Sequence, residues 1–161
     1  MVSRLALIAL LILLTSCAAY KPDAYLPVNS TDTPPDALYG RYLGTSNLYF
    51  SDGSDAVMID AYFSRQSVFD TFVKNIQSDE SYVRKSFKSA KITQLNRLLV
   101  SHSHFDHVLD VDSVSKIFPD VVVHGSAQTG KLFSGVKFID VNETISQGAF
   151  TISAIESPHV K

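Results

Sequence analysis

The stretch that decides the fold covers residues 97–107 and reads RLLVSHSHFDH. An apolar run, LLV, is followed by His102, His104, Asp106 and His107 within six positions. A short apolar run next to polar residues is typical of a buried strand. The four polar side chains are therefore expected to lie directly after the end of a strand.

The spacing of these side chains favours a metal site. Alternate residues of an extended segment point the same way, so His102 and His104 are expected to share one side of the chain, followed by Asp106. A helix that starts near Asp106 would turn His107 toward the same hollow. Imidazole and carboxylate are ligands of zinc, and also of iron and manganese. Because three of the five histidines lie in this stretch, a metal site is favoured over a histidine-rich loop that binds nothing.

The surrounding residues combine strand and helix patterns. Strands are predicted at 45–50, 56–60, 97–100, 120–124 and 136–139, with a hairpin of 144–145 and 149–156 around Gln147-Gly148. The residues Asp52-Gly53-Ser54-Asp55 are typical of a hairpin turn. Helices are predicted at 69–76, with Ser64 or Ser67 as N-cap, at 79–89, with Ser78 as N-cap, and at 108–118. This order predicts an α/β fold, in which helices cover a mixed (α+β) sheet.

The N-terminal residues have the pattern of an export signal. Arg4 is followed by ten apolar residues, 5–14, too few to span a bilayer as a stable helix. The next residues, Leu14-Thr15-Ser16-Cys17, resemble the lipobox of bacterial lipoproteins, in which the cysteine becomes the lipidated first residue. The alternative is an ordinary secretory signal with a chance cysteine. The resemblance implies a signal peptide at 1–16 and a lipidated Cys17 with a proline-containing tether at 17–37.

Cysteine usage and charge exclude some functions. Cys17 is the only cysteine, so the chain can form no internal disulfide. Without residues 1–16, which contain the single cation Arg4, 13 basic residues face 16 acidic ones, a net charge of −3. Binding to phosphate backbones needs clustered Lys and Arg. No such cluster is visible, so a nucleic-acid partner is not expected.

Residues 101–107 resemble the HxHxDH signature of the metallo-β-lactamase-fold hydrolases. Asp60 stands at the end of a predicted strand, where the family typically has an Asp. The segment 156–159, Glu-Ser-Pro-His, resembles the one that carries the third histidine of the family's first metal site, and 121–126 resembles the strand and turn between these motifs. The resemblance covers residues 38–161. It implies a partial domain, the N-terminal half of an αββα sandwich, with the C-terminal half missing.

The resemblance implies a set of site residues. The first zinc would be held by His102, His104 and His159, and Asp106 and His107 would contribute to a second zinc site that is incomplete in this chain. Asp106 is also the candidate catalytic carboxylate, and Asp60 would orient a ligand from behind. The alternatives are a turn-forming Asp60 and a solvated terminal His159. Having histidine at 104 favours zinc over a di-iron centre. His124 is expected to end a strand, and Arg65, Ser101 and Ser103 are candidates for packing or supporting hydrogen bonds.

The implied function is a zinc-dependent hydrolase in which a hydroxide on the metal attacks an ester, phosphodiester or amide. The lipid anchor implies the bacterial cell envelope, at the periplasmic face of an outer membrane where there is one, and a small-molecule or lipid substrate. The alternative is an inactive, lipid-anchored metal-binding remnant. A nucleic-acid-processing member of the same fold is a third hypothesis, which export and the acidic balance disfavour.

Overall fold

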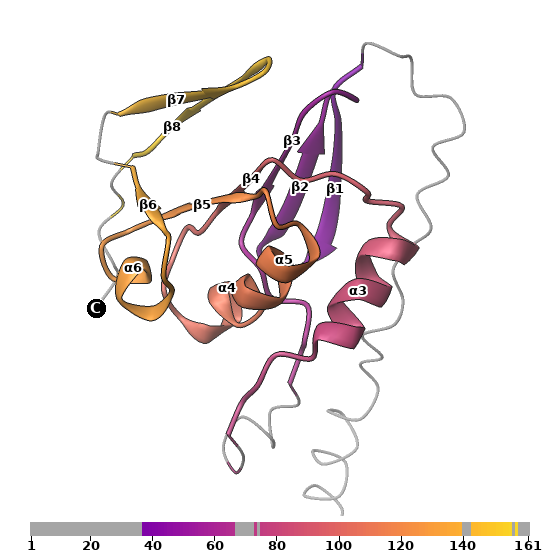
Figure 1. The fold of residues 1–161 in the computed structure, drawn as a ribbon, viewed down its shortest axis with the longest axis vertical. Helices are drawn as coiled ribbons and strands as arrows, with labels where there is room; N and C mark the ends of the chain where they lie inside the picture. The colour runs from indigo at the N-terminus through magenta and orange to yellow at the C-terminus, as the bar shows by residue number, and fades with distance from the viewer. Residues whose placement is uncertain (1–36, 67–72, 74, 140–142, 156, 158–161) are drawn as a thin grey trace, which may run out of the picture.

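The computed structural model describes residues 37–66, 73, 75–139, 143–155 and 157. Six strands form one sheet in the order β1-β2-β3-β4-β5-β6 (Figure 1). Their bounds are β1 (Tyr39–Gly44), β2 (Asn47–Ser51), β3 (Ala56–Ile59), β4 (Arg97–Leu99), β5 (Val122–Gly125) and β6 (Lys137–Phe138). The pairs β1–β2 and β2–β3 are antiparallel, whereas β3 to β6 are parallel neighbours. The sheet is therefore mixed, as the sequence predicts.

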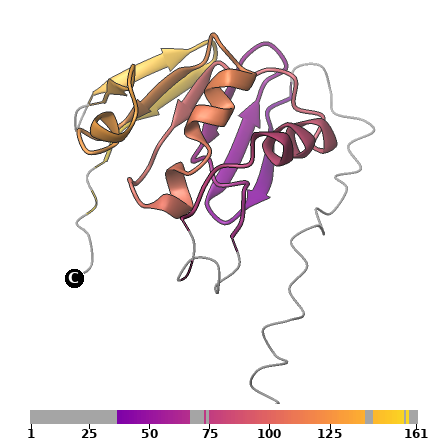
Figure 2. The ribbon, with the colours of Figure 1, turned by 60° about the horizontal axis from the view of Figure 1, so that its bottom comes forward.

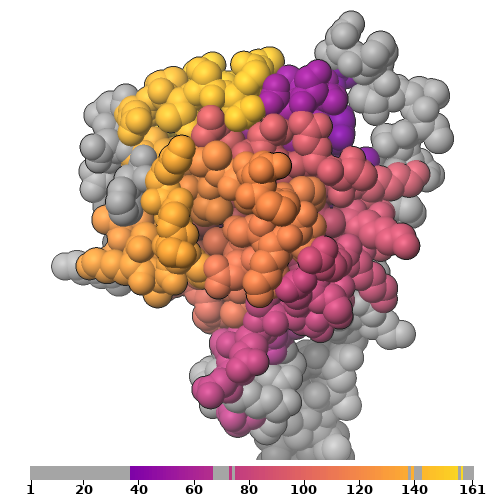
Figure 3. Space-filling view, viewed as in Figure 1, coloured from indigo at the N-terminus to yellow at the C-terminus, as the bar shows by residue number. Residues whose placement is uncertain are grey.

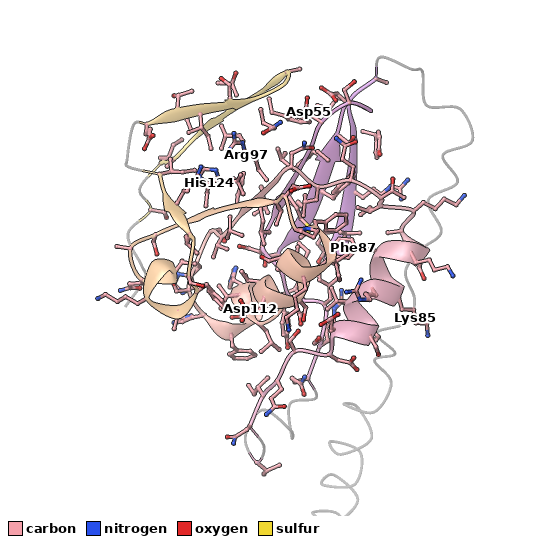
Figure 4. All side chains as sticks on the ribbon, in the orientation of Figure 1. Asp55, Lys85, Phe87, Arg97, Asp112 and His124 are labelled. Carbon is pink, nitrogen blue, oxygen red and sulfur yellow. The ribbon has the colours of Figure 1, made fainter. Side chains whose placement is uncertain are left out.

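Three helices lie on one face of this sheet (Figures 1 and 2). They are α3 (Glu80–Ser89), α4 (Phe105–Val108) and α5 (Val111–Ile117), and the short α6 (Thr129–Leu132) connects β5 to β6. In α3, Val83 and Phe87 are buried four residues apart, a spacing that places them on the same side of a helix. Phe87 points toward the sheet and Lys85 away from it (Figure 4).

A row of side chains across four strands forms the centre of the core. Tyr49 lies opposite Met58, Met58 opposite Leu98, and Leu98 opposite Val123. All four belong to one cluster of buried side chains, together with Val83 and other residues of the helices. Burial of each such side chain contributes about 1.5–3 kcal/mol, so the helix-covered face supplies most of the apolar stabilisation.

The other face of the sheet carries the hairpin of β7 (Thr144–Gln147) and β8 (Phe150–Ser153). Two side-chain contacts attach it: Arg97 Nη2 donates to the carbonyl oxygen of Ser146 at 3.3 Å, and Gln147 Nε2 donates to Asp55 Oδ1 at 2.5 Å. In the space-filling view the hairpin, in yellow, lies beside the indigo N-terminal strands (Figure 3). Inward-facing positions of the hairpin are half-buried and outward ones exposed, which is the alternation of a strand with one covered side.

Several sequence-based predictions agree with the structure. The α/β class with a mixed sheet is confirmed. The Asp52–Asp55 turn is present, where Asp52 Oδ1 accepts from the amides of Ser54 and Asp55 at 2.9 and 2.7 Å. The hairpin around Gln147-Gly148 is also confirmed. Most of the helix predicted at 69–76, and residues 1–36 of the predicted signal and tether, lie outside the described residues.

Two predictions of local structure are wrong, and one strand was missed. Strand β1 was not predicted, because its sequence YGRYLG contains two glycines, which are depleted in strands, and its pairing with β2 cannot be seen in the local pattern. The N-cap of α3 is Asp79, which accepts from the amide of Tyr82 at 3.0 Å, and not Ser78. The helix expected at 108–118 is two helices, α4 and α5, with Leu109 and Asp110 between them.

In the described part of the chain, no helix is both long enough and apolar enough to cross a membrane.

We expect Leu98→Ala to lower the free energy of unfolding of the full chain by about 2–5 kcal/mol, because it leaves a cavity in the middle of the core row. Leu98 is 0% exposed. The control Leu132→Ala, at a side chain that is 57% exposed, should change it by no more than about 0.5 kcal/mol. Urea unfolding measures both, and equal losses would contradict this description of the core.

Candidate metal centre

The described residues of the predicted metal site, Asp60 and those of the segment 102–107, lie at one edge of the sheet, at the carboxyl ends of β3 and β4. The ladder of hydrogen bonds continues past the strands there: the Asp60 amide donates to the carbonyl of Leu99 at 2.9 Å, and the Val100 amide donates to that of His124 at 2.7 Å. Because parallel strands end at the same edge, the segments that follow β3 and β4 lie side by side. This edge is where open α/β sheets bind ligands.

Asp60 is a buried carboxylate that collects donors from two segments. It is 0% exposed and has a φ of 57°, a left-handed conformation that Asp tolerates better than most residues. Its oxygens accept from the amide of Ser101 at 2.8 Å, from the Ser101 hydroxyl at 2.9 and 2.8 Å, and from His107 Nδ1 at 2.7 Å. A buried carboxylate costs much free energy unless it is hydrogen-bonded, so these donors hold the His102–His107 segment against the end of β3.

The contact with Asp60 determines which nitrogen of His107 is available. A carboxylate accepts hydrogen bonds, so Nδ1 carries a proton, and in the neutral ring Nε2 keeps its lone pair. The hydroxyls of Ser46 and Ser101 lie 3.2 and 3.3 Å from the same Nδ1. The Nε2 atom is 3.9 Å from Asp106 Oδ2. A histidine whose second nitrogen donates to a carboxylate is the usual arrangement for a metal ligand.

The His102 imidazole lies beside His107, and the His104 imidazole lies beside His102. The ring centroids of His102 and His104 are 4.0 Å apart, those of His102 and His107 are 5.4 Å apart, and both pairs meet edge to face. His104 is the N-cap of α4, so the helix begins one residue before Asp106. The loop thus places His102 beside both His104 and His107, with Asp106 next to His107, and the chemistry of these side chains fits zinc.

The metal-binding roles stay predictions. Among the residues that the structure describes, no three His, Cys, Asp or Glu side chains are arranged so that they could hold a metal ion together. The predicted third ligand of the first zinc, His159, lies outside the described residues. Asp60 lies where a residue that orients His107 must be, within hydrogen-bond distance of its ring.

The three residues predicted to pack or give supporting hydrogen bonds occupy different places. Ser101 donates to Asp60. The Ser103 hydroxyl lies 2.9 Å from that of the fully buried Thr129, which attaches the histidine loop to the start of α6. Arg65 Nη2 donates to the carbonyl of Leu43 at 2.7 Å.

Sequence reasoning missed two buried polar residues near the site. Asn47 is 0% exposed, and its amide group exchanges hydrogen bonds with the backbone of Tyr62, at 3.0 Å to the amide and 2.9 Å to the carbonyl. Asp110 is also 0% exposed. The available signal was a charged residue inside the apolar pattern of Val108, Val111 and Val114, where a surface carboxylate does not belong.

A cavity of about 480 Å³ lies next to this edge, between the sheet and the segment that contains β8. Its wall is mainly apolar and includes Ile59, Leu99 and Ile152, with His124 and Ser101 among its polar residues. Ser101 belongs both to this wall and to the hydrogen bonds of Asp60. Space for a partly apolar ligand therefore adjoins the histidine loop.

His124 lies in β5, one residue before the strand ends at Gly125 and not at its end as predicted, and it contacts Arg97 of the neighbouring strand. Arg97 Nη1 lies 2.7 Å from His124 Nε2 (Figure 4 shows the two residues close together). Because a guanidinium has no acceptor, Nε2 must accept, and the ring is neutral. Burial of His124 (4% exposed) lowers its pKa, and the charges of Arg97 and Lys137 lower it further, while Glu143 opposes the shift.

This lowered pKa predicts a pH dependence of stability. The folded-state pKa of His124 lies below its unfolded value of about 6.5, so the unfolded chain binds the proton more readily. The contribution of His124 to stability is complete above that value and is lost as the pH falls through it toward the folded-state pKa. Between pH 7 and pH 5 the wild type should lose more free energy of unfolding than His124→Gln, which keeps an acceptor for Arg97.

Urea unfolding at the two pH values measures this difference. Lys85→Gln, an exposed change on α3, serves as the control and should follow the wild type. Parallel pH curves for the wild type and His124→Gln would contradict the assignment.

Comparison with known proteins identifies the family. The profile of the Metallo-beta-lactamase superfamily matches residues 41–145, which include most of the mixed sheet and the whole histidine loop. Among solved structures, the chain is similar to a metallo-beta-lactamase from Hirschia baltica, with 14% identity, a TM-score of 0.42 and 72% of this chain covered. The similarity spans 59% of that protein's chain. No curated protein matches the chain. On the extent of the profile match, the chain belongs to the metallo-beta-lactamase superfamily.

Proposed function

We propose that this chain acts in a zinc-dependent hydrolase that cleaves an ester, phosphodiester or amide. The observation that carries the proposal is the orientation of His107. Its Nδ1 is bonded to the buried Asp60 at 2.7 Å, which leaves Nε2 on the side of Asp106. The His102 ring lies against this ring, and the His104 ring lies against that of His102. The chain also belongs to a superfamily of metal-dependent hydrolases. The superfamily supports the reaction class, and the residues of the loop support the choice of zinc.

In this proposal the imidazoles divide between two ions. His102, His104 and His159 hold the first zinc, while Asp106 and His107 contribute to the second. Three neutral imidazoles with one open position make a catalytic zinc site. The carboxylate and the single imidazole of the second site need further ligands, so the first ion is the one expected to bind more tightly.

Zinc bound there supplies Lewis acidity and lowers the pKa of water to about 7, so that hydroxide is available at neutral pH. The protein groups have separate tasks. Asp60 keeps the His107 proton on Nδ1 and the ring in one orientation. The Asp106 side chain is 43% exposed, so its Oδ2 can exchange a proton with the substrate or with solvent. The apolar cavity beside Ser101 is the space we assign to the apolar part of a substrate.

The proposed location follows from the N-terminal residues. We propose that Cys17 is lipidated and holds the domain at the bacterial cell envelope, which makes a phospholipid or another envelope phosphodiester a suitable substrate. Nucleic acid is not proposed as a partner, because the chain has a net negative charge. The alternative function uses the same residues: a lipid-anchored protein that binds metal and has no catalytic activity.

We expect the full-length protein to hold at least one zinc per chain and to turn over a generic phosphodiester, ester or lactam. The double variant His102→Ala/His104→Ala should lose both properties, because two of the three proposed ligands of the first ion are removed. Elemental analysis and a chromogenic assay measure them. His124→Gln, which removes a histidine outside the proposed ligands, is the matched control and should retain zinc. Zinc without turnover would favour the alternative, and no zinc in the wild type would refute both.

Zinc should leave the protein as the pH falls below about 6, because binding needs neutral imidazoles and protons compete for their nitrogens. Equilibrium dialysis at pH 7.5, 6 and 4, followed by elemental analysis, measures the retained metal. Unchanged retention at pH 4 is incompatible with a first site made only of histidines.

A further inference from the structure

Asp110 is a buried carboxylate that the proposed chemistry does not use. It is 0% exposed. Its Oδ2 accepts from the amides of Phe63 and Ser64 at 2.5 and 2.7 Å. Its Oδ1 accepts from the hydroxyls of Ser64 and Ser78 at 2.6 and 2.5 Å. Four hydrogen bonds therefore compensate for the free energy that it costs to remove this carboxylate from water.

From its position at the start of α5, Asp110 would be expected to cap that helix, but its side chain bonds to other segments. It is the N-cap of α5, where an Asp side chain usually accepts from the first amides of its own helix. Here the side chain makes no capping hydrogen bond. It instead reaches the loop after β3 and, through Ser78, the segment that leads into α3. The Asp110 side chain therefore does not cap its own helix. It connects the start of α5 to the loop after β3 and to the segment before α3.

These contacts lead to the histidine loop through the backbone. The Asp110 amide donates to the carbonyl of Ala61 at 2.9 Å, and the Ala61 amide donates to the carbonyl of His107 at 2.8 Å. Asp60 immediately precedes Ala61 and has the left-handed φ of 57°. Asp110 therefore holds, from its side chain and its amide, the loop that sets the place of Asp60 relative to His107.

We propose that Asp110 is a positioning residue for the metal centre: it fixes the loop 61–64, and through that loop the hydrogen bond between Asp60 and His107. The part of this inference that concerns zinc rests on the proposed function. The part that concerns the hydrogen bond does not, because it can be observed in zinc-free protein.

The test compares Asp110→Asn with Asp112→Asn in the full chain. Asp112 lies two residues further along and is exposed (Figure 4 marks its place on α5). Both changes remove one carboxylate charge. Only the Asp110→Asn change would turn an amide N–H toward donors that need an acceptor.

The first readout is the Nδ1–H proton of His107 in zinc-free protein, observed by NMR with ¹⁵N-labelled histidine. We expect a slowly exchanging signal in the wild type and in Asp112→Asn, and its loss or fast exchange in Asp110→Asn. Leu98→Ala, which weakens the core but removes none of the side chains that bond Asp60, His107 or Asp110, should keep the signal. Its loss in Leu98→Ala as well would overturn the proposal, because any destabilisation would then have the same effect.

The second readout is zinc affinity, measured by competition with a chromophoric chelator. Supporting residues around metal ligands typically contribute about 10- to 100-fold, and we expect about tenfold weaker binding in Asp110→Asn and none of that loss in Asp112→Asn. Unchanged affinity together with an unchanged His107 signal would refute the proposal. If the wild type binds no zinc, the proposed function fails, while the NMR comparison still decides the role of Asp110.

A milder variant covers the case in which Asp110→Asn does not fold. Ser78→Ala removes one of the four donors, and the contact of 2.6 Å with the Ser113 hydroxyl, without adding a donor next to the carboxylate. We expect faster exchange of the His107 proton in a protein that still unfolds cooperatively. Wild-type exchange in Ser78→Ala would count against the proposal in that case.

Discussion

The burial of the Asp60 carboxylate is the constraint on which the candidate centre depends. The side chain is inaccessible to solvent, so its charge has to be met by hydrogen-bond donors from the protein. Those donors come from Ser101, just after β4, and from His107 in α4. These hydrogen bonds to Asp60 therefore fix the start and the end of the histidine loop. They also determine which ring nitrogen of His107 faces outward.

Asp110 is a second buried carboxylate whose charge is met by hydrogen-bond donors from other segments. It joins the loop after β3, the entry to α3 and the start of α5, and the break between α4 and α5 lies beside it. At this break the Asp110 carboxylate accepts from the amides of Phe63 and Ser64 and from the hydroxyls of Ser64 and Ser78.

Much of the fold could be predicted from local patterns, and the reasons for the failures are specific. The Asp52–Asp55 turn follows from chemistry within four residues, and α3 follows from an apolar face with a strong spacing. Strand β1 and the division of the 108–118 helix could not be predicted from local sequence patterns. The strand needs the pairing with β2, and the helix break needs donors such as the Ser64 amide, 46 residues away in the chain.

By itself, the sequence determined the superfamily, the α/β class and the loop that carries the candidate ligands, because a histidine motif after an apolar strand is a local pattern. Only the tertiary structure decided how those ligands are held. It placed Asp60 behind His107 and not merely in a turn. It turned the Asp110 side chain to neighbouring loops and not to the amides of its own helix, and it paired His124 with Arg97. The physical reason is the same in each case: a buried polar group must find its partner in space, and the distance along the chain does not reveal which partner that is.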